Sequence, residues 1–298
     1  MLPLEVPSPM SAAPQPFPIS RQKIRRVLAV DDPSLREFMS HAEFSPEFDL
    51  IKTTLDQFLT AAFRERFDLI ITSPRTTVDQ DIELLECLQK WRGEGVKVII
   101  LAPQTTAQDV IAALRAHAFA LFSIPFDYGS FTTIVETAIS VPIWNDGIEV
   151  ISAKPDWISL RVRCSMVCAE RMLQYGHQLK IDVPNETRDT VLLSFRELLL
   201  NAMEHGGRFN PTLKVDVGYL RTDSMILYYL RDPGAGFDCI KAITTAQSSV
   251  EDPLANVAAR IKKGLRPGGF GIHLANQMLD SLVYNEYGNE VVLIKNLR

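Results

Sequence analysis

The hydrophobic pattern of the chain changes once, near residue 145. Before that point, short apolar runs typical of buried strands alternate with amphipathic segments typical of helices. Strands are predicted at 25–30, 48–54, 68–73, 96–102 and 120–124, and helices at 33–41, 55–66, 80–92, 106–118 and 128–141. Five strand–helix units of this kind predict an α/β fold, a doubly wound parallel sheet with helices on both faces.

After that point the elements become longer and their order changes. Strands are predicted at 147–155, 212–222, 224–232 and 289–296, and helices at 156–176, 185–205 and 270–285. We expect Asp156 to cap the first of these helices, Gly176 to close it and Asn185 to cap the second. Neighbouring strands joined by short turns run antiparallel, so the pattern predicts an α+β sandwich of two layers, with helices on one face of its sheet.

The same change of pattern divides the chain of 298 residues into parts. The first twenty residues hold six prolines, which block both helix and central strand, so residues 1–21 are expected to form a disordered tail. The α/β domain is expected at 22–142 and the α+β domain at 146–298.

Composition narrows the classes of function. The apolar fraction of 46% and charged fraction of 22% are typical of a soluble globular protein, and a net charge of -5 gives no reason to expect a nucleic-acid partner. No apolar run is long enough to cross a membrane and no signal peptide is recognisable, so a cytoplasmic location is expected. Cys87, Cys164, Cys168 and Cys239 form no CxxC pair. We interpret Cys164 and Cys168, which lie at helical spacing, as small core residues and not as zinc ligands.

Two polar residues interrupt an apolar helix in "ELLLNAMEHGG", residues 197–207. Glu197 and Asn201 are four positions apart, so they lie on one helix face. Left unpaired in a core, either group would be strongly destabilising. Two interpretations remain open: a hydrogen-bonded pair between helices, or a pair that faces a bound ligand.

A second polar cluster is "DPGAGFD", which places Asp232, Gly234 and Gly236 at the end of a strand. Glycines at this spacing let the backbone approach a flat ligand, and the carboxylate can accept a hydrogen bond from an exocyclic amine. Taken alone, however, the same residues are typical of a simple turn.

A third cluster, "RPGGFGIHLANQ", carries Gly268, Gly269 and Gly271 into the start of a helix. Free backbone N–H groups and the positive end of the helix dipole then lie together, which favours binding of an anion at this turn. A plain glycine-rich loop is the alternative. Three cationic side chains lie just upstream, either as phosphate contacts or as a solvated basic face: Lys262, Lys263 and Arg266.

The first domain resembles the receiver domain of bacterial response regulators over about one hundred and twenty residues. "VLAVDDP" is similar to the family's first strand with its magnesium-holding acidic pair, here Asp31 and Asp32, and "DLIITSP" and "ALFSIPFDYGSF" are similar to its third and fifth strands. Three positions depart from the pattern. Ser73 replaces the aspartate that accepts a phosphoryl group, Ala102 replaces a Thr or Ser, and Ile124 replaces a lysine. The resemblance therefore implies a pseudo-receiver, a scaffold for protein contacts or dimerisation without phosphotransfer.

The second domain resembles the GHKL ATPases of the Bergerat type, because the three clusters occur in that family's order. Within the superfamily it is most similar to the anti-sigma-factor serine kinases, from about Gly147 to the C-terminus. The resemblance implies that Asn201 coordinates Mg²⁺ on the phosphates of ATP, that Asp232 accepts from the adenine amino group, and that Glu197 lies by the metal as general base. The implied remaining contacts are Gly234 and Gly236 at the base, and Gly268, Gly269, Gly271 and Arg266 at the phosphates, with residues 239–267 as a lid.

We therefore expect a Mg²⁺-ATP-dependent serine/threonine kinase with an anti-sigma-factor antagonist as substrate and a sigma factor as competing partner. The alternative from another class is a non-catalytic ATP-binding module that docks a partner. The intact Glu197 favours the enzyme, since binding alone does not need a base. For a homodimer, the receiver-like helices and the long helix of the second domain are both candidate faces.

Overall fold

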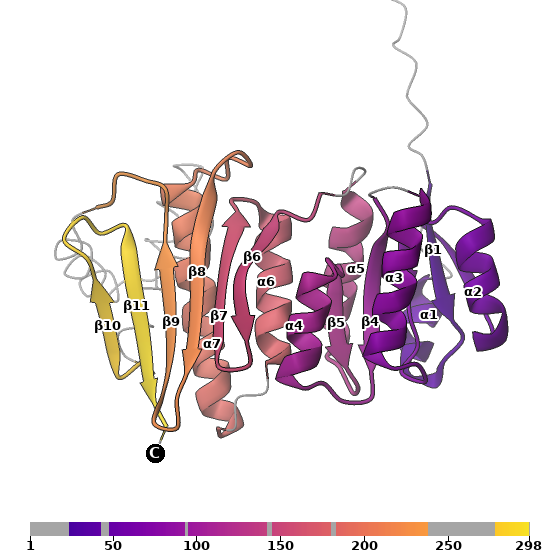
Figure 1. The fold of residues 1–298 in the computed structure, drawn as a ribbon, viewed down its shortest axis with the longest axis horizontal. Coiled ribbons are helices and arrows are strands. Elements are labelled where there is room, and N and C mark those ends of the chain that lie inside the picture. The colour runs from indigo at the N-terminus through magenta and orange to yellow at the C-terminus, as the bar shows by residue number, and fades with distance from the viewer. Residues whose placement is uncertain are drawn as a thin grey trace, which may run out of the picture.

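The computed structural model describes residues 24–42, 48–92, 95–141, 145–179, 183–237 and 278–297. Two β-sheets lie side by side along the long axis of the molecule, one in each half of the chain (Figure 1). The predicted tail at 1–21 lies outside the described residues. Among the described helices, none combines the length and the apolar character needed to span a bilayer.

The first sheet is parallel and has the strand order β2-β1-β3-β4-β5. Its central strands are apolar on both faces and fully buried, as expected for a sheet covered on both sides. An order of 2-1-3-4-5 is the doubly wound arrangement of receiver-like proteins. The strands are β1 (Arg25–Val30), β2 (Phe48–Thr53), β3 (Leu69–Ile71), β4 (Lys97–Ala102) and β5 (Ala120–Ser123).

Five helices cover the two faces of this sheet. The apolar side chains of α1 and α5 pack on one face, and those of α2, α3 and α4 on the other. A short 3-10 turn, η1, precedes α1 and is capped by the Asp32 side chain, which accepts from the Ser34 N–H. The elements are η1 (Pro33–Leu35), α1 (Arg36–Ala42), α2 (Leu55–Arg64), α3 (Val78–Arg92), α4 (Ala107–Arg115) and α5 (Tyr128–Ser140). The predicted α/β fold is thus confirmed.

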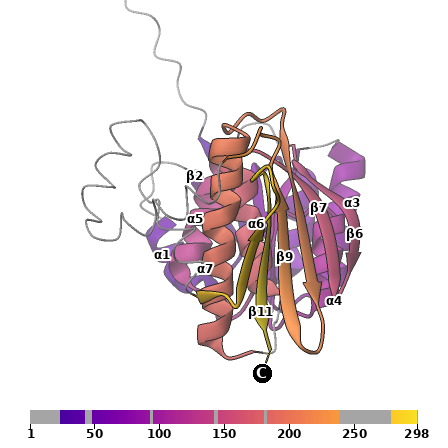
Figure 2. The ribbon, with the colours of Figure 1, turned by 90° about the vertical axis from the view of Figure 1, so that its left-hand side faces the viewer.

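The second sheet is antiparallel, with the order β10-β11-β9-β8-β7-β6. Helices α6 and α7 pack on one face of it (Figures 1 and 2), which confirms the predicted α+β sandwich. The strands are β6 (Ile148–Lys154), β7 (Trp157–Arg163), β8 (Lys214–Arg221), β9 (Met225–Arg231), β10 (Ser281–Tyr284) and β11 (Glu290–Asn296), and the helices are α6 (Met166–Gln178), α7 (Asn185–Asn201) and the π-helical turn η2 (Ala202–Gly206).

The helix predicted at 156–176 is wrong in its first half. Residues Trp157–Arg163 form strand β7, because Ile158, Leu160 and Val162 alternate with outward side chains and pack into the core with period two. Helix α6 begins only at Met166, where the Ser165 side chain accepts from the Cys168 N–H.

Three smaller predictions also need correction. Gly176 lies inside α6 and does not close it, because the helix runs on to Gln178. Asn185 is the first residue of α7 rather than its cap, which is Pro184. Within the helix predicted at 270–285, Ser281–Tyr284 pair with β11 as strand β10; the part before Met278 lies outside the described residues.

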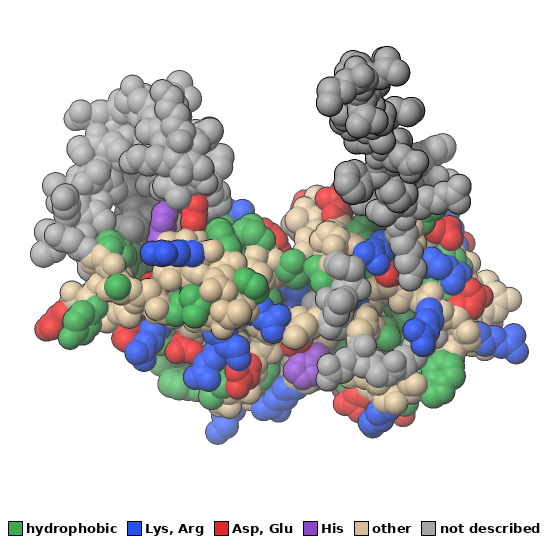
Figure 3. Space-filling view, turned by 90° about the horizontal axis from the view of Figure 1, so that it is seen from above, with side chains coloured by type: hydrophobic (Ala, Val, Ile, Leu, Met, Phe, Trp, Pro, Cys, Tyr) green, Lys and Arg blue, Asp and Glu red, His purple; other side chains and the backbone are tan. Residues whose placement is uncertain are grey.

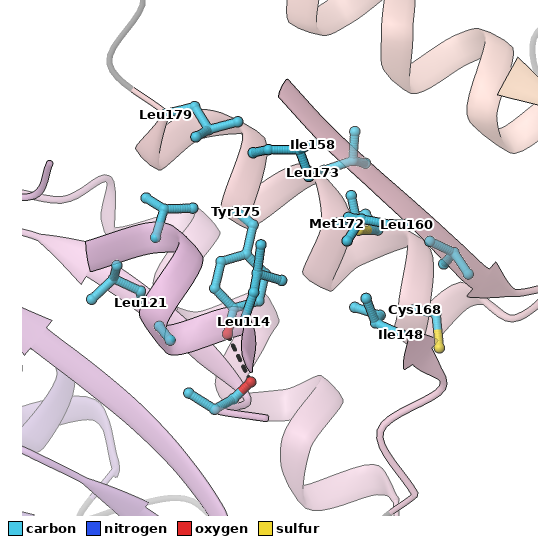
Figure 4. Close-up of a cluster of buried hydrophobic side chains, with 14 of the residues drawn as sticks. Leu114, Leu121, Ile148, Ile158, Leu160, Cys168, Met172, Leu173, Tyr175 and Leu179 are labelled. Atoms are coloured by element: carbon cyan, nitrogen blue, oxygen red, sulfur yellow. Dashed lines mark hydrogen bonds between the residues drawn. The ribbon is translucent and has the colours of Figure 1, made fainter. Parts of the chain in front are cut away.

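Helix α6 joins the two halves by covering the edge of the first sheet. Its side chains bond the backbone beside β5: Arg171 donates to the carbonyls of Ala118 and Phe119 at 3.0 and 2.8 Å, and Gln174 donates to that of Leu121 at 3.0 Å. Tyr175 donates to the Ala118 carbonyl at 2.7 Å (Figure 4). The exposed edge of β5 is thereby satisfied by side chains instead of by another strand.

An apolar cluster continues across this junction. Leu114 and Leu121 of the first half pack with residues of α6 and of strands β6 and β7, among them Ile148, Leu160 and Met172 (Figure 4). The predicted core cysteines Cys164 and Cys168 are buried at its margin. Seen from above, the described side chains of the molecule mix acidic and basic groups on both halves (Figure 3).

Candidate functional site

The polar pair of the apolar helix lies in the last two turns of α7. The side chain of Glu197 is 15% exposed and accepts a hydrogen bond from Arg196 Nη1 at 3.0 Å, while Asn201 is the half-buried last residue of the helix. The apolar residues around them, Leu198, Leu199 and Leu200, are buried. Both polar groups therefore keep some access to solvent at the end of an otherwise buried helix.

Beyond Asn201, the chain brings the first and second polar clusters together. Helix α7 widens into η2, whose last residue is Gly206, and the Asp232 side chain lies directly against that glycine. A Cβ atom on Gly206 would stand 2.1 Å from Asp232 Oδ1, and one on Gly234 would stand 2.8 Å from the Cα of Gly206. Only glycine at these two positions allows the helix end and the turn to approach so closely.

Asp232 begins the turn that follows β9. Its Oδ1 accepts the Gly234 N–H at 2.7 Å, and its own N–H donates to the Asn289 carbonyl at 2.9 Å. Burial raises the pKa of the Asp232 carboxyl, while the Gly234 hydrogen bond and the nearby His205 lower it. The carboxylate is therefore fixed in direction by its own turn, and it retains acceptor capacity on a second oxygen.

Gly236 fixes the far end of the same turn. Its φ is +82°, and a Cβ atom there would stand 1.8 Å from the Tyr287 carbonyl oxygen, so no other residue fits. The Phe237 N–H donates to that carbonyl at 3.0 Å. The turn is thus held against the β10–β11 connection, where Asn285 and Asn289 bond each other at 2.8 Å.

The structure places the predicted site residues as follows. Glu197, Asn201, Asp232, Gly234 and Gly236 come from α7 and the turn after β9, and the contact of Asp232 with Gly206 joins those two segments. The predicted lid at 239–267 and the predicted phosphate contacts lie outside the described residues: Arg266, Gly268, Gly269 and Gly271.

The side-chain oxygens of Glu197 and Asn201 suit a hard cation that is held mainly by the phosphates of a bound nucleotide. Mg²⁺ prefers oxygen donors and is often held by one or two protein groups together with phosphates and water. The half-buried amide of Asn201 and the carboxylate of Glu197, one turn apart, offer such oxygens. Within the described residues there is no cluster of three or more His, Cys, Asp or Glu side chains able to hold a metal without a ligand. These residues therefore fit a cation that arrives with a nucleotide.

Two contributors to the site were missed at the sequence level. Gly206 belongs to the segment 197–207, but its close contact with the Asp232 side chain joins residues 26 positions apart and could not be predicted from that segment alone. Asn289 bonds the backbone of Asp232 and its side chain reaches the Gly234 carbonyl at 3.5 Å. The only sequence feature that indicated a role for Gly206 was the glycine pair Gly206–Gly207 directly after an apolar helix.

In the receiver-like half, side chains of the protein itself surround the acidic residue Asp32 at the carboxyl edge of the sheet. Ser73 is fully buried, and its hydroxyl lies 3.5 Å from Asp32 Oδ2. The Arg75 Nε lies 3.1 Å from the same oxygen, so a side chain of the protein itself neutralises the acidic residue. A cavity of about 370 Å³ beside them also contacts Asp31 and Lys52. The position after β3, where receiver domains carry the phosphoryl-accepting aspartate, is thus occupied by a buried serine, which has no carboxylate to form an acyl phosphate.

Comparison with known proteins finds one matching family. Residues 170–295 match the family described as "Histidine kinase-like ATPase domain". No curated protein matches the chain.

Solved structures similar to the chain include response regulators. The chemotaxis response regulator CheY4 of Vibrio cholerae is 19% identical over 39% of this chain and 98% of its own, with a TM-score of 0.33. A response regulator from Thermotoga maritima is 18% identical over 40% and 99%, with a TM-score of 0.33. The beryllofluoride-activated NtrC receiver domain is 24% identical over 40% and 97%, with a TM-score of 0.32. The strand order β2-β1-β3-β4-β5 is the structural feature that makes the first half receiver-like.

Proposed function

We propose that this chain, which joins a receiver-like domain to a histidine kinase-like ATPase domain, is a Mg²⁺-ATP-dependent kinase of serine or threonine on a protein partner. The observation that supports the proposal is the close contact of the Asp232 side chain with Gly206. That contact places the adenine-binding candidate beside the helix that bears Glu197 and Asn201, as one nucleotide site requires.

Each residue has a defined task in this account. Asp232 accepts a hydrogen bond from the adenine amino group, and Gly234 and Gly236 let the base lie against the backbone. Asn201 and Glu197 hold Mg²⁺, which supplies charge neutralisation at the phosphates. Phosphate contacts are assigned to Arg266, Gly268, Gly269 and Gly271.

Glu197 is the proposed general base, which takes the proton from the hydroxyl of the acceptor serine or threonine. Its carboxylate is partly exposed and accepts a hydrogen bond from Arg196 of the same helix, whose side chain is 40% exposed, and an exposed ion pair of this kind is weak enough to be exchanged for another contact. The partners proposed are an anti-sigma-factor antagonist as the phosphorylated protein and a sigma factor as its competitor.

The test compares the wild-type chain with Glu197→Gln. With γ-labelled ATP, Mg²⁺ and a bacterial extract, we expect label on serine or threonine of one protein with the wild type only. Both forms should still bind Mg²⁺-ATP, because glutamine keeps the shape and one oxygen that can face Mg²⁺, while it cannot accept the proton of the acceptor hydroxyl. Transfer by the variant would refute the role of Glu197, and ATP binding without any transfer would favour the non-catalytic module.

A further inference from the structure

The turn after β9 is held from its far side by the connection between β10 and β11. The two segments are neighbours at one end of the sheet, because Arg231 at the end of β9 pairs with Glu290 at the start of β11 (Figure 1). The Asp232 N–H donates to the Asn289 carbonyl at 2.9 Å. The position of Asn289 therefore determines where the backbone of Asp232 lies.

The side chain of Asn285 fixes Asn289 in that position. Residues 285–288 form a tight turn, in which the Gly288 N–H donates to the Asn285 carbonyl at 3.1 Å, and asparagine and glycine are the favoured residues at its first and fourth positions. Asn285 Oδ1 accepts the N–H groups of Asn289 and Glu290 at 3.1 and 3.2 Å. Its Nδ2 donates to Asn289 Oδ1 at 2.8 Å. One side chain thus makes three hydrogen bonds to the two residues that follow the turn.

The directions of these hydrogen bonds depend on one another. An amide oxygen only accepts and an amide nitrogen only donates. Because Asn285 Oδ1 accepts two backbone N–H groups, its Nδ2 is left to face the oxygen of Asn289. Asn289 then turns its own Nδ2 toward the Gly234 carbonyl, at 3.5 Å. The contacts therefore run from Asn285 through Asn289 to both Asp232 and Gly234.

The orientation of Asp232 has a chemical consequence for the base that can bind. Its Oδ1 accepts the Gly234 N–H at 2.7 Å, so the second oxygen is the acceptor that remains for a nucleobase. Adenine presents an amino donor where guanine presents a carbonyl oxygen. A carboxylate held in one direction accepts from adenine and repels guanine, whereas a carboxylate free to turn aside discriminates less.

We propose that Asn285 is a positioning residue for the choice of nucleotide: through Asn289 it fixes Asp232 in the direction that selects adenine over guanine. This inference rests on the proposed function, because it concerns the same nucleotide site. Gly206 sets how closely α7 approaches Asp232, and Asn285 holds Asp232 from the opposite side.

The test uses the full chain and four single variants, each checked for folding by far-UV circular dichroism. Asn285→Ala removes the three side-chain hydrogen bonds, and Asn285→Asp is the conservative variant, which keeps both acceptances from the backbone. Asn289→Ala leaves the backbone bonds of the turn in place and removes the link to Gly234. Asn296→Ala, an exposed asparagine at the other end of β11, is the matched control.

The first measurement needs no nucleotide and follows hydrogen exchange of the Asp232 amide. Exchange reports how often the bond of that amide to the Asn289 carbonyl opens. It should be about 10-fold faster in Asn285→Ala than in the wild type, and unchanged in Asn296→Ala. Equal rates in the wild type and a folded Asn285→Ala would overturn the proposal.

The second measurement is the ratio of the affinities for ATP and GTP, each titrated with Mg²⁺ in a calorimeter. The wild type should prefer ATP by roughly 100-fold, because guanine would place an acceptor against the carboxylate. Asn285→Ala should bind ATP roughly 10-fold more weakly and narrow the preference to about 10-fold, with Asn289→Ala between it and the wild type. Asn285→Asp should stay within about threefold of the wild-type ratio, because it keeps two of the three hydrogen bonds.

A purely structural role of Asn285 would weaken both nucleotides equally. A ratio that Asn285→Ala leaves unchanged, or that Asn296→Ala narrows as much, would therefore overturn this inference while the proposed function stands. If Asn285→Ala does not fold, an unchanged ratio in Asn289→Ala has the same meaning. A wild type that binds both nucleotides equally would also refute the inference alone, whereas a wild type that binds neither would refute the proposed function as well.

Discussion

Replacing Gly206 by alanine tests the contact on which the nucleotide site depends. The φ of Gly206 lies outside the left-handed region, so the backbone itself accepts alanine. The obstacle is Asp232, whose Oδ1, Cγ and Cβ atoms would stand 2.1, 2.3 and 2.5 Å from the new methyl carbon. The carboxylate must therefore move by roughly 1 Å or more to reach an ordinary contact distance.

That displacement has a calculable effect on binding. The Asp232 carboxylate accepts the Gly234 N–H at 2.7 Å, which fixes its direction. A hydrogen bond to a charged group is worth about 1.5–3 kcal/mol, and losing the one to adenine would weaken ATP binding by roughly 10- to 100-fold. The loss should appear in the affinity for ATP and not in the affinity for Mg²⁺ alone.

The assay is isothermal titration of ATP into the wild type, Gly206→Ala and two controls. Gly176→Ala lies in α6, where the new methyl group would have an ordinary contact at 3.4 Å, and should bind like the wild type. Gly207→Ala would first meet Cys164, whose Sγ atom would stand 2.3 Å from the new methyl carbon, and should lower stability more than it lowers affinity. A folded Gly206→Ala that binds ATP as tightly as the wild type would refute the reasoning.

Two further predictions concern the junction between the halves and the receiver-like half. Arg171→Met should lower the free energy of unfolding by about 3–5 kcal/mol in urea titrations, because the 1% exposed cation bonds three backbone carbonyls and pairs with the Asp146 carboxylate. Lys90→Met should change it by about 0.5 kcal/mol or less; equal effects would contradict this. Burial raises the pKa of Asp81 to about 6, so its contribution to stability is fully present below pH 3.8 and is lost as pH rises through 6. Relative to Asp81→Asn, the wild type should therefore lose up to about 3 kcal/mol between pH 4 and pH 7, and parallel pH curves would show that the carboxyl is not the cause.

Much of the fold was predictable from the sequence because each element carries its own periodicity. The five strand–helix units of the first half were each predicted within a few residues, since their strands are short apolar runs bounded by polar turns. The failure at 156–176 has a specific cause. Trp157–Arg163 has apolar residues at every second position, but it leads directly into a helical segment, and the two were merged into one helix.

For the candidate site, the residues could be predicted from the sequence but their assembly could not. The positions of Glu197, Asn201 and Asp232 followed from spacing and from the order of the motifs. Their assembly did not, because the contact of Asp232 with Gly206 depends on how two distant elements pack. The same is true of Arg171, which reads as one charged residue on a helix and is in fact buried against the backbone beside β5.

Burial of that arginine also gives the receiver-like half a physical link to the second half of the chain. Arg171 and Tyr175 of α6 bond the carbonyl of Ala118, just before β5, while α7 packs on α6 and ends at Asn201.

The proposed kinase requires one Mg²⁺-dependent nucleotide site in the second half of the chain. That site is tested by calorimetric titration of ATP into the intact chain and into Asn201→Ala, each with and without Mg²⁺. The account predicts Mg²⁺-dependent binding to the wild type and loss of that dependence in the variant, since Asn201 supplies a ligand oxygen. An intact chain that binds no ATP in the presence of Mg²⁺ would contradict it.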